Sequence, residues 1–160
     1  MALSVGDTIP NVKLMTMTAE GLKPVESGDV LGKGKVVLFA VPGAFTPTCN
    51  DHHLPGFVMQ ADDILAKGVD RIACIAVNDA FVMGAWGNAQ GTGDKIVMLA
   101  DGSGEFTAAV GLELDLSGPG LGTRSQRYAA ILEDGVVKDL FVEKDTGVNV
   151  SSADAVLKAL

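Results

Sequence analysis

One stretch constrains the fold most: an apolar run that leads directly into a cysteine-bearing turn and a helical segment. Residues 35–41 are almost all apolar and rich in β-branched side chains, a pattern typical of a strand buried on both faces. The Pro-Gly pair at 42–43 ends that strand. From 49 to 67 the apolar spacing becomes helical. The sequence therefore places Cys49 where a strand is followed by a helix.

The position of Cys49 has a chemical consequence. The N-terminus of a helix offers unpaired N–H groups and the positive end of a dipole, and both favour thiolate over thiol. Cys49 is therefore a candidate nucleophile, although a free cysteine is also commonly a small buried hydrophobe. Pro55 fits poorly inside a helix and should bend it or split off its first turn. Gly68 suits the position just after the helix.

Strand and helix patterns alternate along the rest of the chain. Buried strands are expected at 71–77 and 95–100, and paired strands at 126–133 and 136–143 around the hairpin signal Asp134-Gly135. Helices are expected at 79–91, 104–110 and 151–160, the first capped by Asp79 and the last through Ser151 and Asp154. Residues 11–18 suit a strand or edge hairpin, and 20–34 and 111–122 are expected to be loops.

This order of elements predicts an α/β fold. The strand–helix–strand units require parallel neighbours and the hairpin requires an antiparallel pair. We expect a thioredoxin-like fold, a mixed central sheet flanked by helices, with residues 1–160 forming one domain. Thioredoxins carry Cys-x-x-Cys at this junction, but residues 46–49 are Thr-Pro-Thr-Cys. A hydroxyl replaces the first sulfur, so dithiol exchange within the motif is impossible.

Composition excludes several classes of partner. A net charge of -8 and an isoelectric point near 4.6 argue against nucleic acid or an anionic membrane. The first residues show neither a secretory signal nor a transmembrane helix. Two cysteines without secretory context fit a reducing compartment, so we expect a cytoplasmic protein. The two histidines and two cysteines form no metal spacing, and we expect no metal and no bound cofactor.

The residues around Cys49 also carry a family resemblance. Pro42-x-x-x-Thr46-x-x-Cys49 resembles the active-site motif of peroxiredoxins, and the following His53-Leu-Pro-Gly-Phe is similar to the type II (Prx5) subfamily. The resemblance continues through residues 77–86, 99–102 and 122–128 and covers most of the chain. It implies a thiol peroxidase that reduces hydrogen peroxide and alkyl hydroperoxides.

The resemblance implies a role for each residue of the motif. Cys49 would be the peroxidatic nucleophile, Thr46 would hold the peroxide, and Pro42 would shield the sulfenic acid product from water. Arg124 matches the catalytic arginine of the family, whose guanidinium would favour the thiolate and stabilise charge on the breaking O–O bond. Arg127 competes for that role, or pairs with a carboxylate on the surface.

The roles of the two histidines and of the second cysteine are left open by the sequence. His52 and His53 adjoin the nucleophile, and one of them is a candidate base, although the resemblance assigns activation to the arginine and the helix terminus. Cys74 lies mid-strand, where a packed thiol is the ordinary interpretation, and by resemblance it is a candidate resolving cysteine. We expect an external thiol, glutathione then glutaredoxin or else thioredoxin, to resolve the sulfenic acid, with Cys74 optional.

Two further expectations follow from the resemblance. The family implies a homodimer, and Phe45, Phe81 and Trp86 are either core residues or part of its interface. A second functional hypothesis is a redox-sensing or chaperone-like interaction protein in which oxidation of Cys49 is the switch. Catalytic turnover distinguishes the two, because a sensor reacts once and stops.

Overall fold

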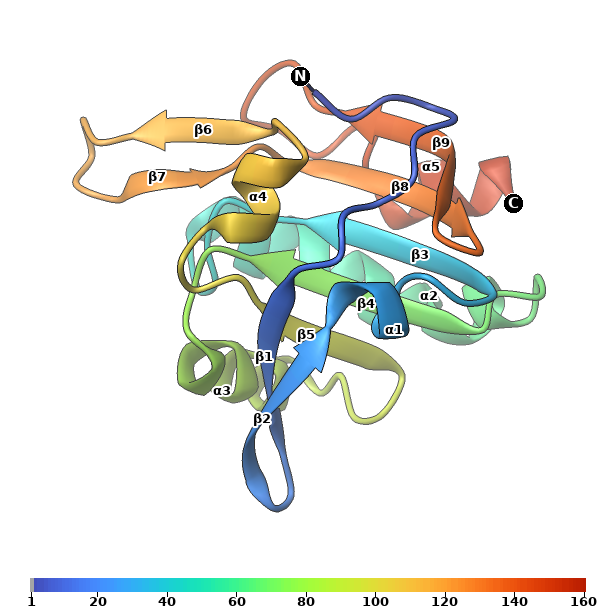
Figure 1. Ribbon diagram of the computed structural model, residues 1–160, viewed down its shortest axis with the longest axis horizontal. Coiled ribbons are helices and arrows are strands. Elements are labelled where there is room, and N and C mark those ends of the chain that lie inside the picture. Colours follow the sequence, from blue (N-terminus) through green and yellow to red (C-terminus); the bar gives the residue numbers. More distant parts are fainter. Residues whose placement is uncertain (1) are drawn as a thin grey trace.

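The computed structural model describes residues 2–160 (Figure 1). A seven-stranded mixed sheet has the strand order β2-β1-β5-β4-β3-β8-β9, and β6 and β7 form a separate ribbon. The strands are β1 (Lys13–Thr18), β2 (Gly21–Glu26), β3 (Lys35–Ala40), β4 (Arg71–Ala76), β5 (Ile96–Ala100), β6 (Glu113–Leu116), β7 (Gly122–Ser125), β8 (Tyr128–Glu133) and β9 (Val136–Val142). The helices are α1 (Ser27–Val30), the π-helical turn η1 (Cys49–His53), α2 (Leu54–Leu65), α3 (Ala80–Gln90), α4 (Glu105–Ala109) and α5 (Ala153–Ala159).

The predicted mixed sheet flanked by helices is confirmed. Strands β3, β4 and β5 are parallel neighbours, whereas β1, β8 and β9 pair antiparallel. Figure 1 shows α2, α3 and α5 behind the sheet and α1 and α4 in front of it. No helix among residues 2–160 is both long and apolar enough to cross a membrane.

The side chains of β3 explain why its sequence is continuously apolar. Val37 and Phe39 point into the core under α2, α3 and α5, whereas Val36 and Leu38 point into the core of the opposite face. All four are fully buried, because helices or loops cover both faces of a strand at the sheet centre. The strand is thereby held rigidly, and its C-terminal end carries the turn that leads to Cys49.

Local signals predicted several boundaries well. The Asp79 carboxylate accepts a hydrogen bond from the Val82 amide at 2.8 Å and caps α3, and Gly91 ends that helix with a left-handed φ of 71°. Asp134 and Gly135 both have positive φ and form the tight turn between β8 and β9.

Two predicted loops are wrong. Residues 20–34 contain β2 and α1, and residues 111–122 contain β6 and the start of β7. Strand β2 lies at the edge of the sheet and carries Pro24, and the β6-β7 ribbon pairs only with itself. Neither segment buries a full apolar face, so neither shows the periodicity by which strands are recognised.

The predicted cap of the last helix is also wrong. Ser152, not Ser151, is the N-cap of α5 and accepts a hydrogen bond from the Ala155 amide at 3.1 Å. Ser151 is fully buried, and its hydroxyl donates instead to the Glu143 carboxylate at 2.6 Å. Adjacent serines have the same capping propensity, so the choice between them depends on what lies nearby.

Candidate active site

Cys49 lies in the first turn of the helix that follows β3. The Leu54 amide donates to the Cys49 carbonyl, a π-type hydrogen bond that makes this turn wide. Pro55 comes immediately after, in the first turn of α2. Because Pro55 has no N–H and its ring would clash with the carbonyl four residues earlier, a wide turn suits this site. The prediction that Pro55 splits off the first turn is confirmed.

The sulfur of Cys49 is buried beside a guanidinium group. Arg127 Nη2 donates to Cys49 Sγ at 3.2 Å, and the exposed fractions of the two residues are 6% and 1%. A cation at this distance in a buried site favours the thiolate, the form that attacks electrophiles. Arg127 Nε is also buried and has no hydrogen-bond partner among the described residues. It is therefore a donor available to a ligand.

Arg124, the predicted catalytic arginine, is not the arginine that bonds the nucleophile, because the hydrogen bond to Cys49 Sγ comes from Arg127. Arg124 stands on β7, where its Nε donates to the Leu121 carbonyl at 2.9 Å and its Nη1 donates to the Pro42 carbonyl at 3.3 Å. Through the bond to Pro42, Arg124 supports the backbone of the turn before Cys49.

The alternation of β8 explains why Arg127 takes this position. Ala129 and Ile131 share a core with Cys49, whereas Tyr128 and Ala130 face the opposite core. Arg127 has the same parity as Ala129 and Ile131 and therefore points to the face of Cys49. The predicted strand at 126–133 already contained this signal. The motif position favours Arg124, whereas the period of two along the strand favours Arg127.

Thr46 and Pro42 lie in one groove with Arg127. The groove has a volume of about 500 Å³ and is also lined by Leu114, Leu116 and Leu121 from the β6-β7 ribbon and the turn within it. Thr46 Oγ1 donates to the Gly43 carbonyl at 2.6 Å, which leaves its lone pairs free to accept a hydrogen bond. Donors and an acceptor thus converge beside a buried sulfur.

Comparison with known proteins agrees with this geometry. The profile of the Redoxin family matches residues 4–157. Peroxiredoxin-2E-2, chloroplastic, of rice is 51% identical over 99% of this chain and 72% of its own length, and Peroxiredoxin-2B of Arabidopsis thaliana is 46% identical over 99% and 98%. Reduced Prx3 in complex with hydrogen peroxide, from Vibrio vulnificus, superposes with a TM-score of 0.94 at 51% identity over 98% of both chains.

The chain belongs to the peroxiredoxin family. It is a thiol peroxidase with a thioredoxin-like fold, and its relatives are type II peroxiredoxins, as the motif around Cys49 predicted. The family acts on peroxides with a thiol reductant as partner.

The sequence left the role of His53 in this peroxiredoxin undetermined, and the structure gives its contacts. The ring is fully buried, with Nδ1 2.9 Å from Arg127 Nη1 and Nε2 2.9 Å from the Ser151 carbonyl. A guanidinium only donates, so Nδ1 accepts and Nε2 carries the proton. Burial lowers the pKa of His53 to about 4, with Arg127 acting in the same direction against the hydrogen bond to Ser151. His53 is therefore neutral at pH 7 and is bonded to the arginine, whereas His52 is exposed.

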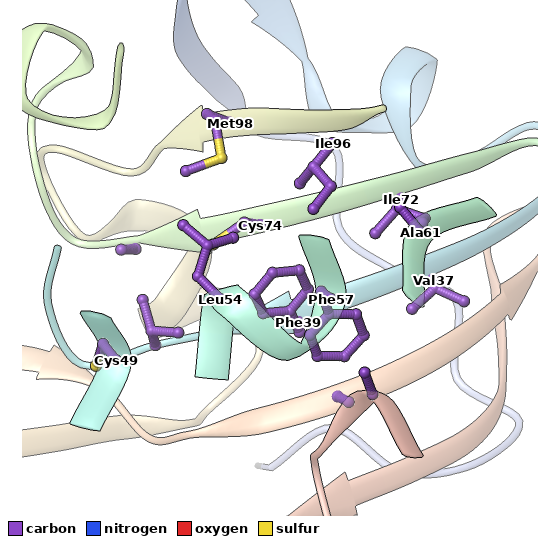
Figure 2. Close-up of a cluster of buried hydrophobic side chains, with 14 of the residues drawn as sticks. Val37, Phe39, Cys49, Leu54, Phe57, Ala61, Ile72, Cys74, Ile96 and Met98 are labelled. Carbon is purple, nitrogen blue, oxygen red and sulfur yellow. The ribbon is translucent and has the colours of Figure 1, made fainter. Parts of the chain in front are cut away.

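Cys74 lies on β4 within the same core as Cys49, and Figure 2 shows it on its strand with Leu54, Phe39 and Phe57 nearby. Its side chain is fully buried, and neither cysteine forms a disulfide. Burial, and secondly the nearby Cys49, raises the pKa of the Cys74 thiol well above its ordinary value. Within residues 2–160, no group of three or more acidic, histidine or cysteine side chains is placed to hold a metal ion.

Proposed function

We propose that this peroxiredoxin reduces hydrogen peroxide and alkyl hydroperoxides at Cys49 and is regenerated by glutathione and glutaredoxin. The observation that carries the proposal is the 3.2 Å hydrogen bond from Arg127 Nη2 to Cys49 Sγ, next to a groove that also contains Thr46 and Pro42. The Vibrio vulnificus relative, described in complex with hydrogen peroxide, supports the choice of substrate.

In the proposed reaction the Cys49 thiolate attacks one oxygen of the peroxide. A sulfur–oxygen bond forms and the O–O bond breaks. The departing oxygen takes the proton of the attacked oxygen and leaves as water or alcohol, and the resulting sulfenate takes a proton from solvent. The sulfur is oxidised to a sulfenic acid by two electrons. Arg127 Nε, which has no hydrogen-bond partner among residues 2–160, donates to the oxygens as negative charge develops on them, and Thr46 Oγ1 accepts the peroxide O–H.

The shape and composition of the groove support alkyl hydroperoxides as substrates. Leu114, Leu116 and Leu121 form an apolar wall of the groove that Thr46 also lines. An alkyl group placed there leaves water, and each buried methylene contributes about 0.8 kcal/mol. Leu116→Ser should therefore raise KM for cumene hydroperoxide several-fold while leaving the rate with hydrogen peroxide unchanged. Equal effects on both substrates would contradict the assignment of this wall.

Regeneration by an external thiol is supported by the burial of Cys74. A disulfide requires Cα atoms within about 7 Å and side chains that face each other, and Cys74 is fixed in the centre of the sheet. Glutathione would attack the sulfenic acid, releasing water and leaving a mixed disulfide on Cys49. Glutaredoxin would then take the glutathionyl group and restore the thiol. Thioredoxin is the alternative reductant.

A homodimer is the proposed assembly. Trp86 is fully buried, but Phe45 and Phe81 are 51% and 64% exposed, so the interpretation of these two as core residues is wrong. The Phe45 and Trp86 rings have centroids 6.4 Å apart, which places Phe45 over α3. Exposed aromatic rings in this region suit a self-complementary interface. Phe81→Glu should produce a monomer in sedimentation experiments, and an unchanged mass would contradict the proposal.

The function is tested by steady-state turnover. Wild-type protein is assayed with hydrogen peroxide or cumene hydroperoxide, using either glutathione with glutaredoxin or thioredoxin with its reductase. We expect continuous turnover with the glutaredoxin system and none in Cys49→Ser. A single stoichiometric oxidation with both reductants would favour the redox-sensing alternative.

A further inference from the structure

The two hydrogen bonds of His53 form the centre of a longer chain of contacts. Cys49 Sγ accepts from Arg127 Nη2, Arg127 Nη1 donates to His53 Nδ1, and His53 Nε2 donates to the Ser151 carbonyl, at 3.2, 2.9 and 2.9 Å. The nucleophile and the start of α5 are thereby joined through one buried imidazole. The proposed reaction uses the first of these bonds and leaves the other two unexplained.

We propose that His53 is a positioning residue, which holds the Arg127 guanidinium on the Cys49 sulfur and ties it to the turn formed by residues 143–152. This inference rests on the proposed role of Arg127 in peroxide reduction. His53 touches neither the sulfur nor the groove in the described contacts, so its effect passes through Arg127.

The geometry explains why a neutral histidine suits this position. Each Arg127 N–H buried in this site needs an acceptor, and a carboxylate there would compete with the thiolate for the guanidinium charge. An uncharged acceptor orients Arg127 without neutralising it. The bond to the Ser151 carbonyl keeps the proton on Nε2, which leaves Nδ1 permanently available as the acceptor.

Glu143 anchors the far end of this series of hydrogen bonds. Its Oε2 accepts from the Asn149 amide at 2.7 Å and from the amide and hydroxyl of Ser151 at 2.8 and 2.6 Å. Burial raises the pKa of the Glu143 carboxyl, but these hydrogen bonds outweigh it and the net pKa lies below its ordinary value. The Glu143 amide also donates to the Arg127 carbonyl at 3.0 Å. The turn therefore fixes Arg127 from both its backbone and its side chain.

The alternative is that His53 merely fills the core. Its ring lies against Phe39 and Phe57, with centroids 5.2 and 5.6 Å apart. If packing were its whole purpose, His53→Phe would retain full reactivity, because phenylalanine preserves the volume and the aromatic contacts. If His53 positions Arg127, the same variant leaves Nη1 without an acceptor.

Three variants at His53 separate its two nitrogens. The amide oxygen of asparagine occupies the place of Nδ1, so His53→Asn keeps an acceptor for Arg127. In His53→Gln the amide reaches the place of Nε2 and the acceptor is lost, and His53→Phe loses both. The exposed neighbour gives the matched control, His52→Asn. Circular dichroism and urea unfolding establish that each variant is folded.

Two readouts are measured by stopped flow and alkylation: the second-order rate constant with hydrogen peroxide, and the rate constant for the reaction of Cys49 with iodoacetamide at pH 7. We expect His53→Phe and His53→Gln to lower the rate with hydrogen peroxide about tenfold and to slow alkylation of Cys49. His53→Asn should stay within about threefold of wild type, and His52→Asn should be unchanged. Equal rates in all three His53 variants, or a wild-type rate in His53→Phe, would overturn the inference.

The link to the turn is tested by combining substitutions. Glu143→Ala should slow oxidation in the wild-type background and add little in the His53→Phe background. In that background the hydrogen bonds that link Arg127 to Ser151 through His53 are already lost. Fully additive effects would overturn the connection between the turn and Arg127. Arg127→Ala serves as the reference. If it reacts at the wild-type rate, the proposed function fails; if it is slow while His53→Phe is normal, only the present inference fails.

Discussion

The two cysteines of this peroxiredoxin are equally buried and belong to the same core, yet their surroundings differ completely. Cys49 lies in a helical turn, receives a hydrogen bond from a guanidinium and lies beside a groove. Cys74 lies on a central strand, opposite Phe39 in the sheet register, where burial holds its thiol protonated. Burial alone therefore does not make a cysteine inert. The charge and the open groove that accompany it decide whether the sulfur can react.

The largest expected difference is between removal of the two sulfurs. Cys49→Ser should abolish turnover, since serine keeps the volume but lacks the nucleophile, whereas Cys74→Ser should keep most glutaredoxin-dependent activity. Steady-state peroxidase assays and mass spectrometry of the oxidised protein check both. Loss of turnover in folded Cys74→Ser, together with a Cys49–Cys74 disulfide in the wild type, would make Cys74 the resolving residue.

The next difference is between the two arginines. Arg127→Ala should lower the rate of sulfenic acid formation about a hundredfold, because one charged donor aimed at developing charge contributes about 3 kcal/mol. Arg124→Ala should lower it much less, since the side-chain hydrogen bonds of Arg124 within residues 2–160 go to the Leu121 and Pro42 carbonyls. Stopped-flow oxidation with hydrogen peroxide compares them. A reversed order would restore the motif-based assignment of Arg124.

Reaction with iodoacetamide also distinguishes the two thiols. Cys49 should be labelled in the folded protein, because its sulfur accepts a hydrogen bond from the Arg127 guanidinium and lies beside a groove. Cys74 should remain unlabelled in the folded protein at every pH where the fold persists, and should react once urea is added. Labelling of both cysteines at the same rate would remove the distinction.

The smallest expected effect is a pH dependence of stability from His53. Its pKa of about 4 in the folded protein lies below the ordinary 6.5, so the unfolded chain binds the proton more tightly. Stability is therefore complete above about pH 6.5 and falls as the pH approaches 4. The expected loss between pH 7 and pH 5 is about 2 kcal/mol.

Urea unfolding of wild type and His53→Phe at both pH values measures this contribution. The variant has no titrating ring at position 53, so its loss of stability between pH 7 and pH 5 should be smaller by that amount. An identical loss in both proteins would mean that the folded protein binds this proton as tightly as the unfolded chain, and would contradict the lowered pKa of His53.

The sequence alone predicted the framework and the nucleophile. The apolar run at 35–41, the Asp79 cap, Gly91 and the Asp134-Gly135 turn are local signals, because each depends on the backbone preferences of a few adjacent residues. The placement of Cys49 after the strand followed in the same way. The motif around Cys49 then identified the family, since the spacing from Pro42 to Cys49 lies within one short segment.

Only the tertiary structure decided which groups surround the sulfur. Arg124 and Arg127 are equally basic and only three residues apart, and their difference arises because Arg127 shares the parity of Ala129 on β8. The bond of His53 to Ser151 joins residues far apart in the chain. The antiparallel pairing of β3 with β8 and the docking of α5 bring these groups together. Such contacts depend on which strands become neighbours, which no local pattern of residues specifies.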